Sequence, residues 1–273
     1  MPPEIGILAG GGILPRRLAE AAASEKRKVF IVAFKGQADP ATVEGFDHVW
    51  VRLGAAGEAI KALKNAGCRE LVMAGHVRRP SLVELRPDWR AACLFAKTGL
   101  SALGDDGLLK AVRSELESEG FRLVAPQDVM RGLLMPPGNL SKAIPGKQAE
   151  IDINKGIAVL KVLAPLDVGQ AVVVQQGLVL GIEAIEGTAS LLRRVRDYRR
   201  EGQGGVLVKL SKAQQDTSLD LPTIGPDTIE QAHAAGLSGL AVEAGRALFL
   251  DSARTLARCD ELGLFLLGVE ILP

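Results

Sequence analysis

The sequence of 273 residues is short of cysteine, of aromatic residues and of any surplus of charge. Its cysteines, Cys68, Cys93 and Cys259, lie far apart and form no CxxC motif. We therefore expect the reduced thiols of a cytoplasmic protein and not a disulfide framework or a zinc site. The 33 basic and 32 acidic residues give a net charge of +1, and the aromatic residues are seven Phe, two Trp and one Tyr. Without a basic surplus or stacking platforms, we expect no nucleic acid among its partners.

A long apolar run is also missing. No stretch reaches the roughly 18 apolar residues of a membrane-spanning helix, and Met1–Glu4 lacks the basic start and apolar run of a signal peptide. Apolar residues nevertheless make up 47% of the chain, which is enough to bury a sizeable core. We therefore expect a globular protein of the cytoplasm.

The first half of the sequence alternates strand patterns with helical patterns. Strand patterns occupy residues 5–9, 29–34, 49–53, 70–74 and 121–124, and helical patterns occupy residues 13–25, 56–65 and 108–119. This alternation predicts βαβ units, and hence an N-terminal Rossmann-like domain over residues 1–134, with a parallel sheet and helices. Three prolines and two glycines between Met135 and Gly146 predict a linker at residues 135–147.

The order of elements changes after this segment. Helical patterns occupy residues 151–163, 190–200 and 252–262, and strand patterns occupy residues 171–174, 178–185, 206–210, 239–243 and 265–269. The tripeptide Gln175-Gln176-Gly177, between two of these strands, is typical of a hairpin turn. We predict a second α/β domain with a mixed sheet over residues 148–273, so that the whole chain is an α/β protein.

Three glycines, Gly10, Gly11 and Gly12, separate the first strand from the first helix. Such a loop lets backbone N–H groups approach an anion at a helix N-terminus. A nicotinamide dinucleotide is disfavoured, because Pro15 replaces the third glycine of the usual fingerprint and Lys35 stands where an acid would hold the ribose. Binding of another anion and a structural tight turn are the two interpretations left.

A basic loop follows the strand pattern at residues 70–74. It contains His76, Arg78 and Arg79, and Pro80 biases the preceding residue away from helix. Open α/β sheets bind ligands beyond the carboxyl ends of their strands, so two guanidinium groups and an imidazole at this place indicate capture of phosphate or carboxylate. The alternative is a solvated basic loop.

Pairs of acidic residues occur at two element boundaries. Asp105 and Asp106 open a helical pattern, where they either cap the helix or hold a divalent cation. Glu183 and Glu186 lie three residues apart, where a strand pattern gives way to a helical one.

A polar run in the second half combines lysines with acids. It contains Lys209, Lys212 and Asp216 and is followed by Asp220 in a segment rich in turn residues. Each piece alone is typical of a solvated loop, whereas the combination indicates a site for a phosphorylated ligand and a hard metal ion. The sequence contains no Walker loop, nucleophile elbow or HExxH motif.

Taken in order, several motifs resemble those of the LpxI family: AGGGILP, KGQADP, AGHVRRP, GDDGLL, LDVGQ, IEAIEGT, GVLVK and DLPTIG. The resemblance covers nearly the whole chain. Members of that family are UDP-2,3-diacylglucosamine pyrophosphatases of lipid A synthesis in Gram-negative bacteria, which release UMP and 2,3-diacylglucosamine 1-phosphate (lipid X). The resemblance implies two α/β domains with the substrate between them and a divalent cation, typically Mg²⁺. It also implies attack of water on the phosphorus of the glucosamine side.

The resemblance assigns roles to individual residues as well. It implies that Asp220, the acid of the DLPTIG motif, is essential, and we expect it to bind the metal or to accept the proton of the water. Further oxygen ligands of the metal are expected among Asp216, Glu186, Asp105 and Asp106. The groups expected to bind the substrate are Gly10, Gly11, Gly12, His76, Arg78, Arg79, Lys209, Lys212, Thr188 and Thr223.

A diacylated substrate further implies an apolar groove and transient contact with the inner membrane. The arginines between Arg193 and Arg200 are candidates for touching anionic lipid, with a solvated helix face as an equal alternative. Association of two copies of the chain is another expectation. Two rival functions stay open: a nucleotide-sugar oxidoreductase that uses the glycine loop, and a non-catalytic protein that binds a phospholipid or a nucleotide.

Overall fold

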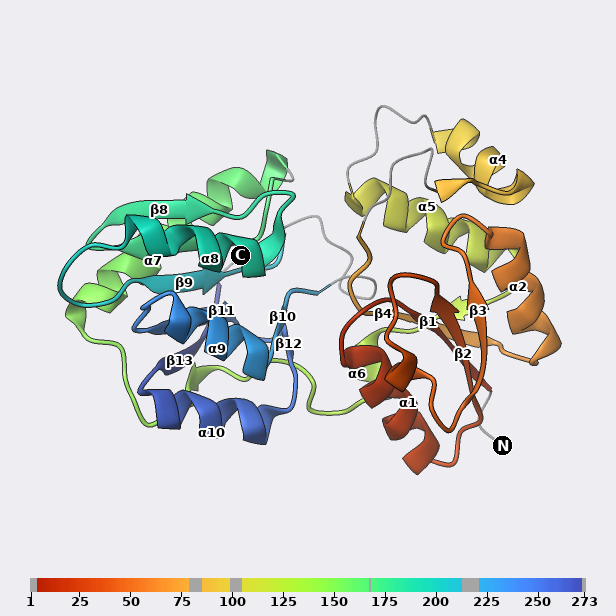
Figure 1. Cartoon of the computed structure of the whole chain (residues 1–273), viewed down its shortest axis with the longest axis horizontal. Coiled ribbons are helices and arrows are strands. Elements are labelled where there is room, and N and C mark those ends of the chain that lie inside the picture. The colour runs from red at the N-terminus through yellow and green to blue at the C-terminus, as the bar shows by residue number, and fades with distance from the viewer. Residues whose placement is uncertain (1–3, 79–84, 99–104, 167, 213–220, 272–273) are drawn as a thin grey trace. The chain divides into compact units, whose positions relative to one another are not determined.

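The computed structural model describes residues 4–78, 85–98, 105–166, 168–212 and 221–271 (Figure 1). These residues form two compact units, one within Met1–Arg131 and the other within Gly132–Gln215 and Leu221–Pro273. Each unit has its own sheet and its own apolar core. The predicted α/β class is confirmed in both.

The sheet of the first unit has five parallel strands in the order β3-β2-β1-β4-β5. The strands are β1 (Ile5–Ala9), β2 (Val29–Phe34), β3 (Asp47–Val51), β4 (Glu70–Ala74) and β5 (Arg122–Leu123). The three central strands are almost entirely buried, as expected of parallel strands covered on both faces. The order reverses between β1 and β4, and at such a reversal an open α/β sheet leaves a crevice at its carboxyl edge.

Helices cover both faces of this sheet. They are α1 (Leu14–Ser24), α2 (Ala56–Asn65), α4 (Trp89–Thr98), α5 (Asp105–Ser118) and α6 (Pro126–Val129), with a 3-10 turn η1 (Pro40–Thr42). Figure 1 shows α1 and α6 on one side of the sheet and α2, α4 and α5 on the other. Leu63 of α2 and Leu116 of α5 pack with Leu8 and Val32 in one of the cores, because alternate strand residues point to the same face.

The sheet of the second unit has six strands in the order β6-β13-β11-β9-β7-β8. The strands are β6 (Gly138–Asn139), β7 (Ala171–Gln175), β8 (Leu178–Ile182), β9 (Val206–Lys209), β11 (Gly239–Glu243) and β13 (Phe265–Val269). The last three are parallel to one another, and β6, β7 and β8 are antiparallel to their neighbours. The mixed sheet is thus confirmed. So is the hairpin between β7 and β8, in which Gln176 and Gly177 both have positive φ, of 53° and 75°.

The helices of the second unit divide between the two faces of its sheet. They are α7 (Lys147–Leu163), α8 (Gly187–Val195), α9 (Pro226–Ala234) and α10 (Ser252–Leu262), with 3-10 turns η2 (Ala164–Leu166) and η3 (Arg196–Tyr198). Val172 and Val174 lie in one core with residues of α7, whereas Val173 lies in another core with residues of α8, α9 and α10, so successive residues of one strand belong to two different cores. A separate pair of parallel strands, β10 (Thr223–Ile224) and β12 (Leu248–Phe249), lies beside this sheet.

Several elements differ from the sequence expectation. Residues 135–147, expected to form a linker, include β6, which pairs with β13, and Met135 of this segment is buried in the core of the second unit. Helix α7 begins four residues before the predicted Ile151, and β8 ends at Ile182, three residues before the predicted end. Helix α9 and the short strands β6, β10 and β12 were not predicted. These strands have two residues each, too few to display an alternating pattern.

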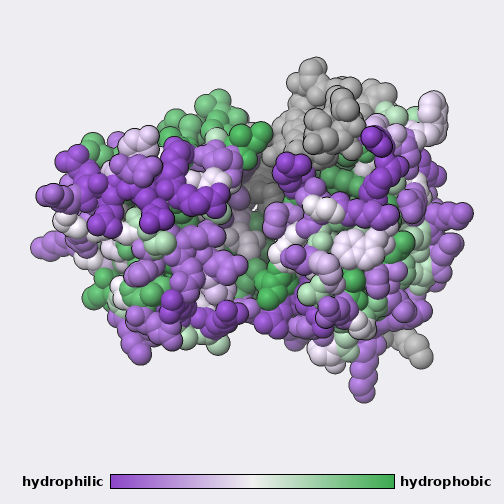
Figure 2. All heavy atoms as spheres, in the orientation of Figure 1, coloured by the Kyte–Doolittle hydropathy of each residue, from purple (hydrophilic) through white to green (hydrophobic). Residues whose placement is uncertain are grey.

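Cys68 and Cys259 are buried free thiols. Burial raises the pKa of the Cys68 thiol to about 11 and that of Cys259 to about 12. Figure 2 shows hydrophilic side chains over most of the visible face of each unit, and hydrophobic ones gathered at the carboxyl-terminal end of α7. None of the helices in the described part of the chain is both long enough and apolar enough to cross a bilayer.

Candidate functional site

The glycine loop of the first unit is joined to the loop that follows β4. The Gly11 N–H donates to the His76 carbonyl at 2.8 Å, and the His76 N–H donates to the Gly11 carbonyl at 3.1 Å. A Cβ atom on Gly11 would lie 2.6 Å from Cε1 of the His76 ring and 2.8 Å from the Gln37 carbonyl. Glycine is therefore required at this position by the close approach of three chain segments.

Gln37 connects these two loops to the segment after β2. Its side-chain Nε2 donates to the Arg78 carbonyl at 3.3 Å, and its Oε1 accepts from the Arg78 N–H at 2.8 Å. The carboxyl ends of β1, β2 and β4 thus lie together at one edge of the sheet, and the structure places Gly10–Gly12, His76 and Arg78 close to one another there. Arg79 lies outside the described residues. Sequence reasoning did not select Gln37, although its place just after a strand of the parallel sheet was a usable signal.

A second group of polar residues lies at one edge of the sheet in the second unit. The parallel strands β9 and β11 end there with Lys209 and Glu243. Because β7 runs antiparallel to β9, its start and the end of β8 reach the same edge, which adds Gln170 and Glu183. Buried charges of both signs at one sheet edge are costly unless they have partners. Lys209, Glu183 and Glu243 all have hydrogen-bond partners at this edge.

Lys209 is the centre of the first set of contacts. Its side chain is almost enclosed, with 5% of the residue exposed. The ammonium Nζ donates to Thr188 Oγ1 at 3.0 Å and to the Thr223 carbonyl at 3.1 Å. Thr188 Oγ1 in turn donates to Glu183 Oε1 at 2.6 Å, and the other Glu183 oxygen accepts from the Gln170 N–H at 3.1 Å. The sequence-predicted Lys209, Thr188 and Thr223 are therefore together. They are joined by Glu183, which sequence reasoning noted but gave no role in the site, and by Gln170, which it did not select.

Glu243 forms the second set of contacts at this edge. Its carboxylate accepts from the Ser211 N–H at 2.7 Å and lies 3.7 Å from Nε of Arg246. Burial raises the pKa of Glu243, and the Ser211 N–H and the charges of Arg246 and Lys161 only partly oppose this. Ser211 and Glu243 were missed because they lie 32 positions apart, and only the pairing of β9 with β11 makes them neighbours.

The acids expected to bind a metal are placed differently. The Glu186 carboxylate is exposed and accepts from Arg194 Nη2 at 2.6 Å. A hydrogen bond from its own N–H and the Arg194 guanidinium lower the pKa of Glu186, despite partial desolvation. Asp216 and Asp220 lie outside the described residues.

Asp105 and Asp106 begin α5, but their side chains also lie outside the described part. Among the residues that the structure does describe, no three His, Cys, Asp or Glu side chains are grouped so that they could hold a metal ion. Lys212 is half-buried, directly after Ser211.

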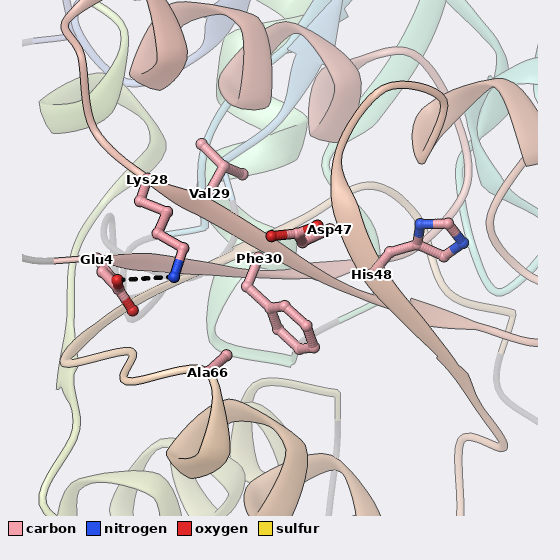
Figure 3. A pocket seen from close by; sticks show the side chains of 7 residues that line it. All are labelled: Glu4, Lys28, Val29, Phe30, Asp47, His48 and Ala66. Atoms are coloured by element: carbon pink, nitrogen blue, oxygen red, sulfur yellow. Dashed lines mark ion pairs between the residues drawn. The ribbon is translucent and has the colours of Figure 1, made fainter.

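A surface hollow of about 270 Å³ lies elsewhere, at the amino ends of β1, β2 and β3. Figure 3 shows Lys28 directed toward Glu4, with a distance of 3.0 Å between Nζ and Oε1, and Asp47 and His48 on the neighbouring strand. The carboxyl ends of these strands, where the glycine loop lies, are at the opposite edge of the sheet. The hollow is thus separate from the predicted ligand site.

Comparison with known proteins gives matches over both units. A family model of the LpxI N-terminal domain matches residues 4–133, and one of the LpxI C-terminal domain matches residues 136–267. The chain is 40% identical over 274 residues to the UDP-2,3-diacylglucosamine pyrophosphatase LpxI of Caulobacter vibrioides, with 98% of each chain covered.

Solved structures give much weaker matches. CobK precorrin-6A reductase is 12% identical with a TM-score of 0.34, covering 99% of this chain and 90% of that one. An N5-carboxyaminoimidazole synthase from Aspergillus clavatus is 15% identical with a TM-score of 0.25, covering 90% and 45%. TM-scores this low carry no conclusion about fold or function.

Proposed function

The chain belongs to the LpxI family, and from this premise we propose that it is a hydrolase of the pyrophosphate bond of UDP-2,3-diacylglucosamine. The observation that carries the proposal is 40% identity over 98% of both chains to an enzyme named for that substrate. The products are then UMP and 2,3-diacylglucosamine 1-phosphate. Water supplies the oxygen of the new phosphate group, and the bond from the attacked phosphorus to the bridging oxygen breaks.

Charge neutralisation on the phosphate oxygens is the first requirement of this reaction. The second unit offers Lys209, and Lys212 lies three residues further along the chain. The first unit offers the glycine loop with His76 and Arg78. We assign these groups to the substrate phosphates, with Arg79, Thr188 and Thr223 as further contacts.

Positioning of the attacking water is the second requirement. We assign the proton acceptor to Asp220 and the site of attack to the phosphorus on the glucosamine side. A divalent cation, Mg²⁺, would supply Lewis acidity and lower the pKa of a bound water. We propose that its oxygen ligands come from the group Asp220, Asp216, Glu186, Asp105 and Asp106. The ion pair of Glu186 with Arg194 would have to open for Glu186 to serve as a ligand.

A membrane contact is part of the proposal, because the two acyl chains hold the substrate in a bilayer. Val162 near the end of α7 and Leu166 in the turn η2 that follows are 73% and 68% exposed, and hydrophobic side chains gather there in Figure 2. We propose that the protein acts in the cytoplasm and touches the inner membrane transiently. Association of two copies stays an expectation without an assigned surface.

The reaction is tested with the purified chain, UDP-2,3-diacylglucosamine in detergent and water labelled with ¹⁸O. We expect release of UMP in the presence of Mg²⁺, loss of release with EDTA, and ¹⁸O in the lipid phosphate. Label in UMP would move the attack to the other phosphorus. Nucleotide binding without release of UMP would favour a non-catalytic binding protein and contradict the proposal.

Asp220→Ala tests the assigned proton acceptor. We expect the turnover rate to fall by about 10³-fold or more, since general base catalysis and metal binding would both be affected. Substrate binding, measured by co-purified lipid or by equilibrium titration, should persist. Asp227→Ala, an exposed acid in the first turn of α9, is the matched control and should keep wild-type turnover. Near-normal hydrolysis by Asp220→Ala would remove this residue from catalysis.

A further inference from the structure

We propose that Glu183 is a positioning residue that acts through the Thr188 hydroxyl to fix the ammonium of Lys209 for phosphate binding. The inference rests on the proposed function, because it takes Lys209 as a ligand of a substrate phosphate. It adds a residue to that site, Glu183, and changes the part that Thr188 plays in it.

The argument begins with the single proton of the Thr188 hydroxyl. A hydroxyl can donate one hydrogen bond and accept two. The Thr188 proton points to Glu183 Oε1, 2.6 Å away, and a carboxylate can only accept. The oxygen of Thr188 is therefore left to accept from Lys209 Nζ at 3.0 Å. While this series of hydrogen bonds is intact, Thr188 cannot donate to a phosphate, so we assign that donation to Lys209.

The carboxylate of Glu183, at the start of this series of hydrogen bonds, is itself held at both oxygens. Oε1 accepts from Thr188, and Oε2 accepts from the Gln170 N–H at 3.1 Å. Glu183 is 6% exposed, so water does not compete freely for these positions. A carboxylate fixed in this way orients the hydroxyl without reorganisation when substrate arrives, which is the arrangement expected of a preorganised site.

The ammonium at the other end is fixed by a second acceptor. Lys209 also donates to the Thr223 carbonyl at 3.1 Å, so its Nζ has at least two acceptors of defined direction. A lysine side chain otherwise has large rotamer freedom, and a phosphate contact made by a freely rotating ammonium is weak. This series of hydrogen bonds therefore links the end of β8, the first turn of α8, the end of β9 and the start of β10. It orders the side chains from Glu183 through Thr188 to Lys209.

Because Glu183 and Lys209 are both buried, the hydrogen bonds between them through Thr188 also have an electrostatic role. Lys209 is 5% exposed, and a buried cation needs a nearby anion or strong acceptors. Glu183 supplies negative charge one hydroxyl group away. Replacing Glu183 by Gln keeps the shape of the side chain but removes that charge, and its amide can donate to Thr188 in competition with Lys209.

A double-mutant cycle in the full chain tests this inference. The variants are Glu183→Gln, Lys209→Met and the two combined, each assayed for kcat and KM with UDP-2,3-diacylglucosamine and for thermal unfolding. We expect Glu183→Gln to lower kcat/KM by about tenfold or more when Lys209 is present, and by less than about twofold when it is Met. Thr188→Val should behave like Glu183→Gln, and Thr188→Ser should restore near wild-type rates. Glu230→Gln, an exposed residue of α9 that is paired with Arg258, is the charge-matched control with wild-type rates.

A measurement independent of turnover completes the test. In protein labelled with ¹⁵N-lysine, the ammonium signal of Lys209 is identified by its absence in Lys209→Met. We expect a slowly exchanging signal in the wild type, and its loss or shift in Glu183→Gln and Thr188→Val. An unchanged signal, or losses that simply multiply in the double mutant, would overturn the inference. A wild-type chain that releases no UMP would instead refute the proposed function, and the ammonium signal would still decide whether Glu183 fixes Lys209.

Discussion

Glu70 and Glu243 are both buried, but their pKa values are shifted in opposite directions. Arg122 and Arg27 both donate to Glu70, and these hydrogen bonds lower its pKa although burial opposes the shift. Glu243 has a backbone N–H and a more distant guanidinium, and burial prevails and raises its pKa. The difference lies in the number and distance of the positive charges, because desolvation always favours the neutral carboxyl group.

Glu243→Gln should therefore change how stability depends on pH. A carboxyl whose pKa is raised in the folded state binds its proton more tightly there than in the unfolded chain. The free energy of unfolding then falls as pH rises from about 4.5, the ordinary value, through the folded pKa. The variant lacks this loss, so its melting temperature relative to wild type should increase between acidic and neutral pH.

Thermal unfolding at several pH values from about 3 to 8 measures this difference. Glu230→Gln is the control with the opposite sign. The Arg258 guanidinium lowers the pKa of Glu230, so that variant should be at a disadvantage at neutral pH that disappears in acid. If the difference in melting temperature between Glu243→Gln and the wild type did not vary with pH, the raised pKa of Glu243 would be contradicted.

At the scale of elements, α7 approaches its sheet unusually closely. Gly156 is in the middle of this helix, and a Cβ atom there would lie 2.5 Å from Cγ2 and 2.9 Å from Cβ of Val208 on β9. A glycine inside a helix costs about 1 kcal/mol relative to alanine. In α7 the close contact with Val208 explains why a glycine stands at position 156. The same contact holds α7 against the strand that ends in Lys209.

Gly156→Ala should consequently destabilise the second unit. Overpacking of a core costs about 1–3 kcal/mol, which exceeds the gain of about 1 kcal/mol in helix propensity. We expect the free energy of unfolding, measured with urea, to fall by roughly 1–2 kcal/mol. Lys155→Ala, exposed on the same helix, is the control and should have little effect. A rise in stability for Gly156→Ala would show that α7 can move away from the sheet.

At the scale of the whole molecule, the two units have separate cores. Leu63 is buried among residues of α2, α5 and the five-stranded sheet, and Leu207 is buried among residues of the six-stranded sheet and its helices. Among the residues that the structure describes, these two cores have none in common. Proteins with two such cores commonly depart from two-state unfolding.

Leu63→Ala and Leu207→Ala test whether the units unfold independently. Truncating a buried leucine costs about 2–5 kcal/mol. In scanning calorimetry we expect two transitions, one lowered by each substitution and the other left in place. If both substitutions lowered a single cooperative transition equally, the units would not be thermodynamically separate.

The sequence alone determined the α/β class, the parallel sheet of the first unit and the mixed sheet of the second. Patterns of five or six residues carried these predictions: buried apolar runs such as Val29–Phe34, and the Gln176-Gly177 turn, which requires positive φ. Such signals are local, because the periodicity of a strand and the conformation of a turn depend on neighbouring residues. The order of motifs likewise sufficed to recognise the family.

The tertiary structure alone decided which polar residues share a site. Gln170, Glu183, Lys209 and Glu243 are distant in sequence, and they meet because β8, β7, β9 and β11 are adjacent in the sheet. Strand order depends on how whole helices and strands pack, and no local pattern encodes it. For the same reason the sequence indicated a role in the site for Glu186, which is paired with Arg194, and none for Glu183, whose carboxylate accepts from Thr188 five residues later.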